Sequence, residues 1–132
     1  MSIAFLTVDD VTQVFPLDDG GRYVALKDID LSISEGATVD LNGKTQILNG
    51  LSGGGVVNNS TGTAINLTVG ARDSSSTFSG VLQNTGGGAL TLVKTGTGTL
   101  TLSSRQAYTG STIVSRGTIQ LNFAGAPLSL AE

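Results

Sequence analysis

Residues 90–121 read LTLVKTGTGTLTLSSRQAYTGSTIVSRGTIQL, and three short segments inside this stretch alternate apolar and polar residues. These segments are Leu90–Leu92, Leu100–Leu102 and Ile119–Leu121. Alternation with a period of two sends apolar side chains to one face of a β-strand and polar side chains to the other. Glycines separate the segments and favour bends where a Cβ would hinder the backbone. The stretch therefore predicts short strands stacked as rungs, with corners at Gly96, Gly98, Gly110 and Gly117.

A weak repeat extends this pattern toward the N-terminus. Pairs of apolar residues follow Gly36, Gly62 and Gly87 at the same offsets, and these glycines are spaced by 26 and 25 residues. A fixed period in this range is typical of architectures whose units bury their apolar faces only against neighbouring units. The pattern predicts an inward-facing core of Val39, Leu41, Ile65, Leu67, Leu90, Leu92, Leu100, Leu102, Ile119 and Leu121.

Two tight-turn dipeptides leave a second fold open. Asn42-Gly43 and Asn49-Gly50 suit the corner of a solenoid and equally suit a two-residue β-hairpin, which would favour an antiparallel sandwich. The glycine-rich and asparagine-rich loops between the strands differ in length, and a solenoid accommodates such loops without disturbing its stack. We therefore expect an all-β, single-domain β-solenoid.

The chain of 132 residues divides into three parts by composition. We expect residues 1–35 to form acidic N-terminal strands or a cap, residues 36–122 to form the solenoid, and residues 123–132 to form a tail or cap. The net charge is −3, and eight of the ten acidic residues lie in the first 40 positions. No basic stripe or long apolar run is present, so the sequence argues against nucleic-acid binding and membrane insertion.

The absence of His and Cys excludes Ser-His-Asp and Cys-His catalysis and His-ligated metals. A carboxylate pair acting on a polysaccharide would draw on Asp28, Asp30 and Asp40. Asp28 and Asp30 alternate with apolar residues, which favours a solvated strand face over catalysis. Asp18 and Asp19 are weak calcium candidates, and a plain acidic turn explains them as well. We expect a protein that is not an enzyme and has no cofactor.

Three segments carry a resemblance to a known family: Lys94–Ser103, Ala107–Thr112 and Gly117–Leu121. They resemble the autotransporter passenger-associated β-strand repeat of bacterial surface proteins, which implies a right-handed parallel β-helix outside the cell or on its surface. The family shares no catalytic residues, and the resemblance places Tyr108 at a corner with its hydroxyl exposed. Ser104–Gln106 departs from the usual small-residue and Asn stretch. A signal peptide and a membrane barrel are not visible in these residues, so we expect a piece of a longer exported protein or another export route.

Three functions remain open at this point. The first is a structural stalk, scaffold or adhesin module whose partners are neighbouring solenoid repeats. The second is a subunit that stacks head to tail with identical copies through the open solenoid ends, which present unpaired backbone groups, and so grows into a filament or sheet. The third is a carbohydrate-binding or fibre module that recognises a surface glycan or a host partner, an expectation based on fold analogy.

Overall fold

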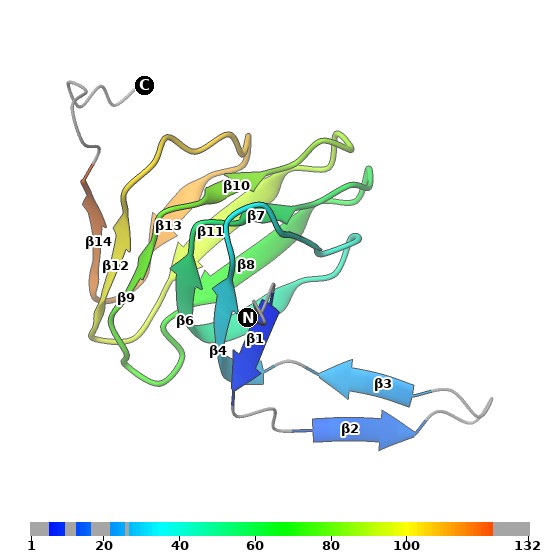
Figure 1. Cartoon of the computed structure of the whole chain (residues 1–132), viewed down its shortest axis with the longest axis horizontal. Coiled ribbons are helices and arrows are strands. Elements are labelled where there is room, and N and C mark those ends of the chain that lie inside the picture. The colour runs from blue at the N-terminus through cyan, green and yellow to red at the C-terminus, as the bar shows by residue number, and fades with distance from the viewer. Residues whose placement is uncertain (1–5, 10–12, 17–21, 26, 123–132) are drawn as a thin grey trace, which may run out of the picture.

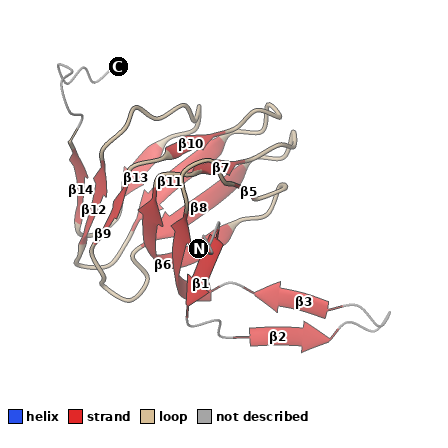
Figure 2. Ribbon diagram, viewed as in Figure 1, coloured by secondary structure: helices blue, strands red, loops and turns tan. Residues whose placement is uncertain are grey.

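The computed structural model describes residues 6–9, 13–16, 22–25 and 27–122, and every regular element in these ranges is a β-strand (Figure 2). The strands are β1 (Leu6–Asp9), β2 (Gln13–Pro16), β3 (Arg22–Ala25), β4 (Lys27–Ile33), β5 (Thr38–Asp40), β6 (Gln46–Gly53), β7 (Val56–Asn58), β8 (Ile65–Val69), β9 (Ser76–Phe78), β10 (Val81–Gln83), β11 (Leu90–Lys94), β12 (Thr99–Leu102), β13 (Thr112–Val114) and β14 (Thr118–Leu121).

From β4 onward, parallel pairing arranges the strands in three faces. Face one contains β5, β7 and β10; face two contains residues 46–48 of β6 with β8, β11 and β13. Face three contains residues 30–33 of β4, residues 50–53 of β6, β9, β12 and β14, while Lys27 and Ile29 of β4 pair with the face-two part of β6. The chain visits the faces in rotation and completes about five turns. This arrangement confirms the predicted β-solenoid (Figure 1).

The turns differ in length, which corrects part of the predicted repeat. Ile65 pairs with Leu90 at the expected spacing of 25 residues, but Val39 pairs with Val57 on face one. The predicted equivalence of Val39 and Ile65 is therefore wrong. Its physical cause is that β6 runs through the corner between faces two and three as one strand of eight residues, which shortens the first turn. Alternating strands look alike on every face, so sequence periodicity did not separate them.

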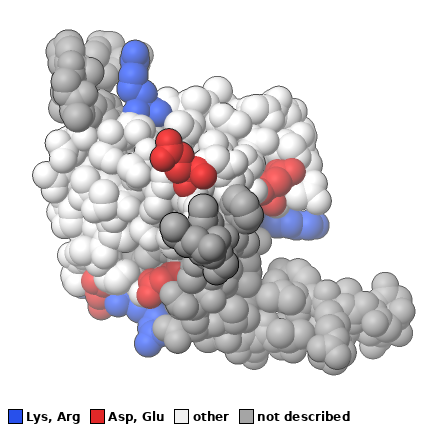
Figure 3. Space-filling model, viewed as in Figure 1, with Lys and Arg blue, Asp and Glu red and all other residues white. Residues whose placement is uncertain are grey.

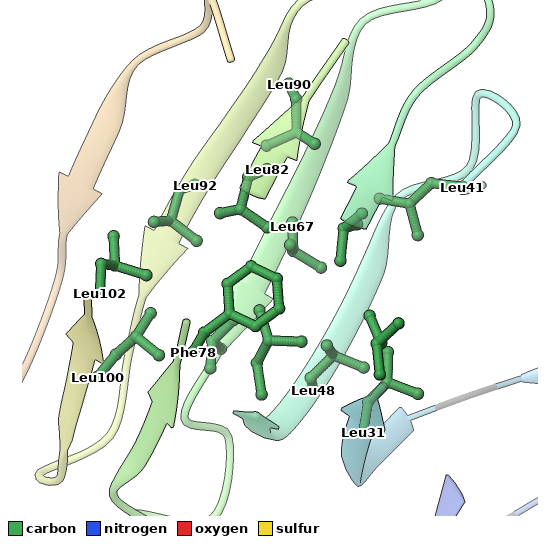
Figure 4. Packing of buried hydrophobic residues seen from close by; sticks show 14 of the residues in the cluster. Leu31, Leu41, Leu48, Leu67, Phe78, Leu82, Leu90, Leu92, Leu100 and Leu102 are labelled. Atoms are coloured by element: carbon green, nitrogen blue, oxygen red, sulfur yellow. The ribbon is translucent and has the colours of Figure 1, made fainter. Parts of the chain in front are cut away.

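Aliphatic side chains fill the interior in columns that run across the turns (Figure 4). Phe78 is fully buried and its ring points in among leucines contributed by all three faces. Burying a side chain of this size contributes about 1.5–3 kcal/mol. Of the residues expected in the core, Val39, Ile119 and Leu121 are half-buried against it. The others are buried: Leu41, Ile65, Leu67, Leu90, Leu92, Leu100 and Leu102.

The two ends of the stack are built differently. At the N-terminal end β1 pairs antiparallel with β4, while β2 and β3 pair with each other and extend away from the stack (Figure 1). At the C-terminal end β13 and β14 are the last strands, and each has one paired edge among the described residues. Parallel pairing begins with β4, before the boundary that we expected at residue 36. The expected tail at 123–132 lies outside the described residues.

Candidate functional site: the polar corners

The corner between faces one and two carries a repeated hydrogen-bond device. Asp40 ends β5, and its carboxylate accepts from the amide and the hydroxyl of Ser60 in the next turn, at 3.1 and 2.6 Å. Asn58 accepts in the same way from the amide of Thr85, at 3.1 Å. Asn84 accepts from the amide of Thr109 at 2.8 Å. A side-chain oxygen at the end of each face-one strand therefore binds the following turn.

These hydrogen bonds lower the pKa of the Asp40 carboxyl group. The Ser60 hydroxyl, and next the amide of Asn42, hold the pKa of Asp40 below its usual value. Hydrogen bonds donated to a carboxylate favour its charged form. Asp40 thus acts in the first turn as the neutral Asn58 acts in the second, and the corner has a structural role.

A buried asparagine lies beside this corner and joins three turns. Asn59 is fully buried, and its amide nitrogen donates to the carbonyls of Thr63 and Gly88, at 2.8 and 2.9 Å. Its oxygen accepts from the amide of Gly43 at 3.0 Å and from the hydroxyl of Thr61 at 3.1 Å. A buried amide is tolerated when its bonds are made. The sequence pattern did not predict the burial of Asn59.

Lys94 is the residue that sequence reasoning missed. It ends β11 in register with Val69 of β8 and Val114 of β13, and its side chain is fully buried. The ammonium group donates to the carbonyls of Thr95 and Gly96. Its position after Leu90 and Leu92 in the alternating pattern would have shown that it points inward.

Burial lowers the pKa of Lys94, and the carboxylate of Asp73 offsets part of that shift. Glycines on the adjacent turns leave room for the amine, because a Cβ on Gly70 would lie 2.7 Å from Nζ and one on Gly117 would lie 2.9 Å from it. Lys94 therefore binds corner carbonyls from inside the stack.

The predicted corner residues lie where the chain changes face. Gly96 and Gly117 have positive φ angles of 71° and 76°, which side chains rarely adopt. A Cβ on Gly98 would lie 2.2 Å from the Ser74 carbonyl oxygen, and one on Gly110 would lie 2.2 Å from that of Leu90. Tyr108 packs half-buried against the core, and its hydroxyl bonds the hydroxyl of Thr112.

A shallow hollow of about 240 Å³ lies on the outside of the stack. Its lining residues are Asp30, Gly50, Ser52, Ser74, Ser75 and Ser76. Asp30 accepts a hydrogen bond of 2.8 Å from Asn49. Asp30 lies on face three and Asp40 on face one, so the structure does not bring these two carboxylates together.

The described part of the chain holds no cluster of acidic side chains of the kind that binds a metal. No group of three acidic residues that would hold a metal occurs among those residues. Asp18 and Asp19 lie outside them, and the side chain of Asp28 is not described. No helix in the described ranges is long and apolar enough to span a membrane. Charged side chains are sparse on the face that Figure 3 shows, which is mostly uncharged.

The last full turn, which contains Lys94 and its glycine corners, matches a known family. Residues 92–121 match the passenger-associated-transport-repeat. The match confirms the resemblance expected for residues 90–121. The repeat begins inside β11 and ends with β14, so it spans the corner held by Lys94 and the turn of Tyr108. No solved structure matches the chain.

Three curated transport proteins also match part of the chain. The nitrate import ATP-binding protein NrtC of Synechocystis sp. is 48% identical over 54 residues, which cover 37% of this chain and 8% of that protein. NrtC of Synechococcus elongatus is 46% identical and the bicarbonate transport ATP-binding protein CmpC of Synechocystis sp. is 44% identical, with the same coverage. The chain thus spans about 8% of the length of these relatives.

The names of these relatives raise the question of a phosphate-binding loop. Such a loop has a glycine five positions before Gly-Lys-Ser/Thr and a helix after it. Gly43-Lys44-Thr45 supplies the end of the motif, but Thr38 stands at the first glycine position and strand β6 follows. The amide of Gly43 already donates to Asn59. These residues therefore do not fit a phosphate cradle.

Proposed function

We propose that the chain is a non-enzymatic structural module of a bacterial surface or extracellular protein, in which the solenoid serves as a stalk or scaffold. The observation that carries this proposal is the use of the polar corner side chains. Asp40, Asn58, Asn59 and Asn84 all bond from one turn to another. Every buried side-chain nitrogen or oxygen in the described residues has a hydrogen-bond partner. This complete pairing supports a structural use of the buried polar groups.

The proposed location is supported by the recognised repeat, whose name refers to passengers, and is tested by access from outside the cell. Protease added to intact cells of the source bacterium should remove the protein, while a cytoplasmic marker should survive. Protection in intact cells and loss only after lysis would contradict a surface position.

The structural role has a separate test. Purified chain incubated with a panel of bacterial and plant polysaccharides should release no reducing ends. Activity that disappears in Asp30→Asn, with the fold intact by circular dichroism, would overturn the proposal. Asp73→Asn is the matched control, because the Asp73 side chain is likewise exposed but lies outside the hollow.

A further inference from the structure

The C-terminal end of the stack carries unused backbone groups. The amides of Thr118 and Asn122 donate to carbonyls of the preceding turn, at 3.2 and 2.9 Å. Amides of alternate residues point to opposite edges of a strand, so those of Ile119 and Leu121 point to the outer edge of β14. No described strand pairs with that edge.

Apolar side chains on the same end are exposed. Val114 of β13 is 50% exposed, whereas Val69, which occupies the same column two turns earlier, is 1% exposed. Ile113, which points to the outer side of β13, is 46% exposed. Free edges and exposed apolar side chains together mark a surface on which a further strand layer stacks.

The N-terminal end offers a strand of matching length. β1 and β14 both contain four residues, and β1 covers the outer edge of β4 in antiparallel orientation. The second edge of β1 pairs with no described strand. If one copy is stacked on another in the same direction, this edge meets the free edge of β14 and the two strands pair antiparallel.

The charges at the two ends are opposite. Residues 103–122 hold Arg105 and Arg116 and no acidic residue, whereas residues 29–40 hold Asp30, Glu35 and Asp40 and no basic residue. An end-to-end contact between two C-terminal ends would oppose like charges. A contact between unlike ends joins an acidic surface to a basic one.

The opposite charges share the same corners of the solenoid. Glu35 lies at the corner between faces three and one, and Gly54 and Ser79 lie at the same corner in the next two turns. A Cβ on Gly54 would lie 3.6 Å from the Glu35 Cβ and 3.4 Å from the Ser79 hydroxyl oxygen. Ser104 continues this column by donating to the Ser79 carbonyl at 2.7 Å, and Arg105 follows it directly. The acidic start and the basic end of the stack therefore lie on one line.

The corner between faces two and three repeats this arrangement. Asp30 lies there in the first turn, bonded to Asn49, and Arg116 lies there in the last turn, where its amide donates to the Lys94 carbonyl at 3.3 Å. Asp30, Glu35, Arg105 and Arg116 are all exposed. We propose that the C-terminal end of the solenoid binds the N-terminal end of a second copy of this chain, with β14 paired to β1 and the acidic and basic corners facing each other.

This contact is heterologous and does not close, so it predicts an open series of assemblies. Sedimentation velocity over a wide range of concentrations should show a mass that rises without a plateau at low salt and falls as salt is added. A single chain at every concentration would overturn the proposal. A plateau at two copies would also overturn it, because it indicates a closed contact between like ends.

Charge exchange tests the geometry. Glu35→Arg and Arg105→Glu should each weaken association by up to about fivefold, since exposed ion pairs are worth little individually. An equimolar mixture of the two variants should regain association, because each N-terminal end then meets a C-terminal end of opposite charge. Arg72→Glu is the matched control: it makes the same charge change in the middle of the stack and should leave association unchanged.

All of these positions are exposed, and circular dichroism verifies that each variant is folded. Val114→Lys supplies an independent test, because it places a charge in the apolar part of the end without touching the corners. It should also weaken association. Association that is indifferent to both Arg105→Glu and Val114→Lys would contradict the proposed surface. The experiment is independent of the proposed location, since a surface stalk that remains single would overturn this inference alone.

Discussion

The middle turns and the last turn of the solenoid are built from similar strands but differ in burial. Leu100 and Leu102 of β12 are 0% and 1% exposed, while Ile119 and Leu121, which pair with them in β14, are only half-buried. The sequences of the two strands, TLTL and TIQL, follow the same alternation. A residue in this fold is therefore buried by the turn on each side of it, and its own pattern decides only the direction in which it points.

The largest test of this comparison is Phe78→Ala, which should lower the free energy of unfolding by about 3–5 kcal/mol, because it leaves a cavity in the middle of the stack. Phe78 is fully buried and is paired through β9 with β12. The measurement is urea denaturation followed by circular dichroism.

Val114→Ala in the last turn is the matched control and should change stability by less than about 0.5 kcal/mol, as expected for a surface position. Val114 is 50% exposed. Equal losses for the two variants would show that the last turn is as well covered as the middle, and the contrast between the regions would fail.

A second test uses the polar interior. Asn59→Ala should cost about 1–3 kcal/mol, because it leaves buried backbone groups of neighbouring turns without their partner. The affected groups include the amide of Gly43 and the carbonyl of Gly88. Urea denaturation measures the loss.

Asn84→Ala is the comparison for Asn59→Ala, since Asn84 bonds Thr109 near the end of the stack through exposed contacts. Its effect should be smaller, because water replaces the lost bonds. A larger loss for Asn84→Ala than for Asn59→Ala would contradict the view that the middle turns hold the stack together.

Sequence reasoning reached the fold because the alternating segments and their glycines record local geometry. It placed Leu92, Leu100 and Leu102 in the interior, where they are buried. It did not separate the faces, since Val39 and Ile65 have the same local pattern but lie on different faces. That assignment depends on the length of the corner loops. Asn42-Gly43 forms a turn with positive φ angles, whereas Asn49-Gly50 lies inside β6, although the two dipeptides are alike in sequence.

Lys94 shows a different limit. The period of two in β11 places its side chain inward, and the carbonyls that bind it come from the corner that follows. Buried lysines are rare unless such partners exist. For Lys94, the alternation of the strand predicts the direction of the side chain better than the residue type does. The alignment of Glu35 with Arg105 along one corner of the solenoid is visible only in the structure.

Lys94 also gives a prediction about pH. Because burial lowers its pKa in the folded chain, the unfolded chain binds more protons between the folded pKa and the usual lysine value of 10.5. Stability should therefore rise with pH as it approaches 10.5, relative to Lys94→Met, which does not titrate. Denaturation midpoints measured from neutral to alkaline pH test this.

Val114→Lys places a lysine in the same column at the exposed end of the stack, and it serves as the control for Lys94. This lysine is not desolvated, so its contribution should not show the alkaline rise. A rise of the same size in a chain that carries Lys94→Met together with Val114→Lys would contradict burial as the cause.

The smallest effect is expected at Asp40, on the exposed corner of the first turn. Its pKa lies below the usual 3.8 in the folded chain, so its contribution to stability is present above 3.8 and is lost as the pH falls through the folded value. Asp40→Asn should remove this acid-dependent loss while keeping an oxygen for the Ser60 amide, and paired denaturation curves at neutral and acidic pH measure it.

Asn58→Asp makes the reverse change at the residue aligned with Asp40 in the next turn. It should acquire the same acid dependence through Thr85, because the two corners share one hydrogen-bond geometry. Acid dependence in one variant and not in the other would show that the first turn and the middle turns do not use the same corner.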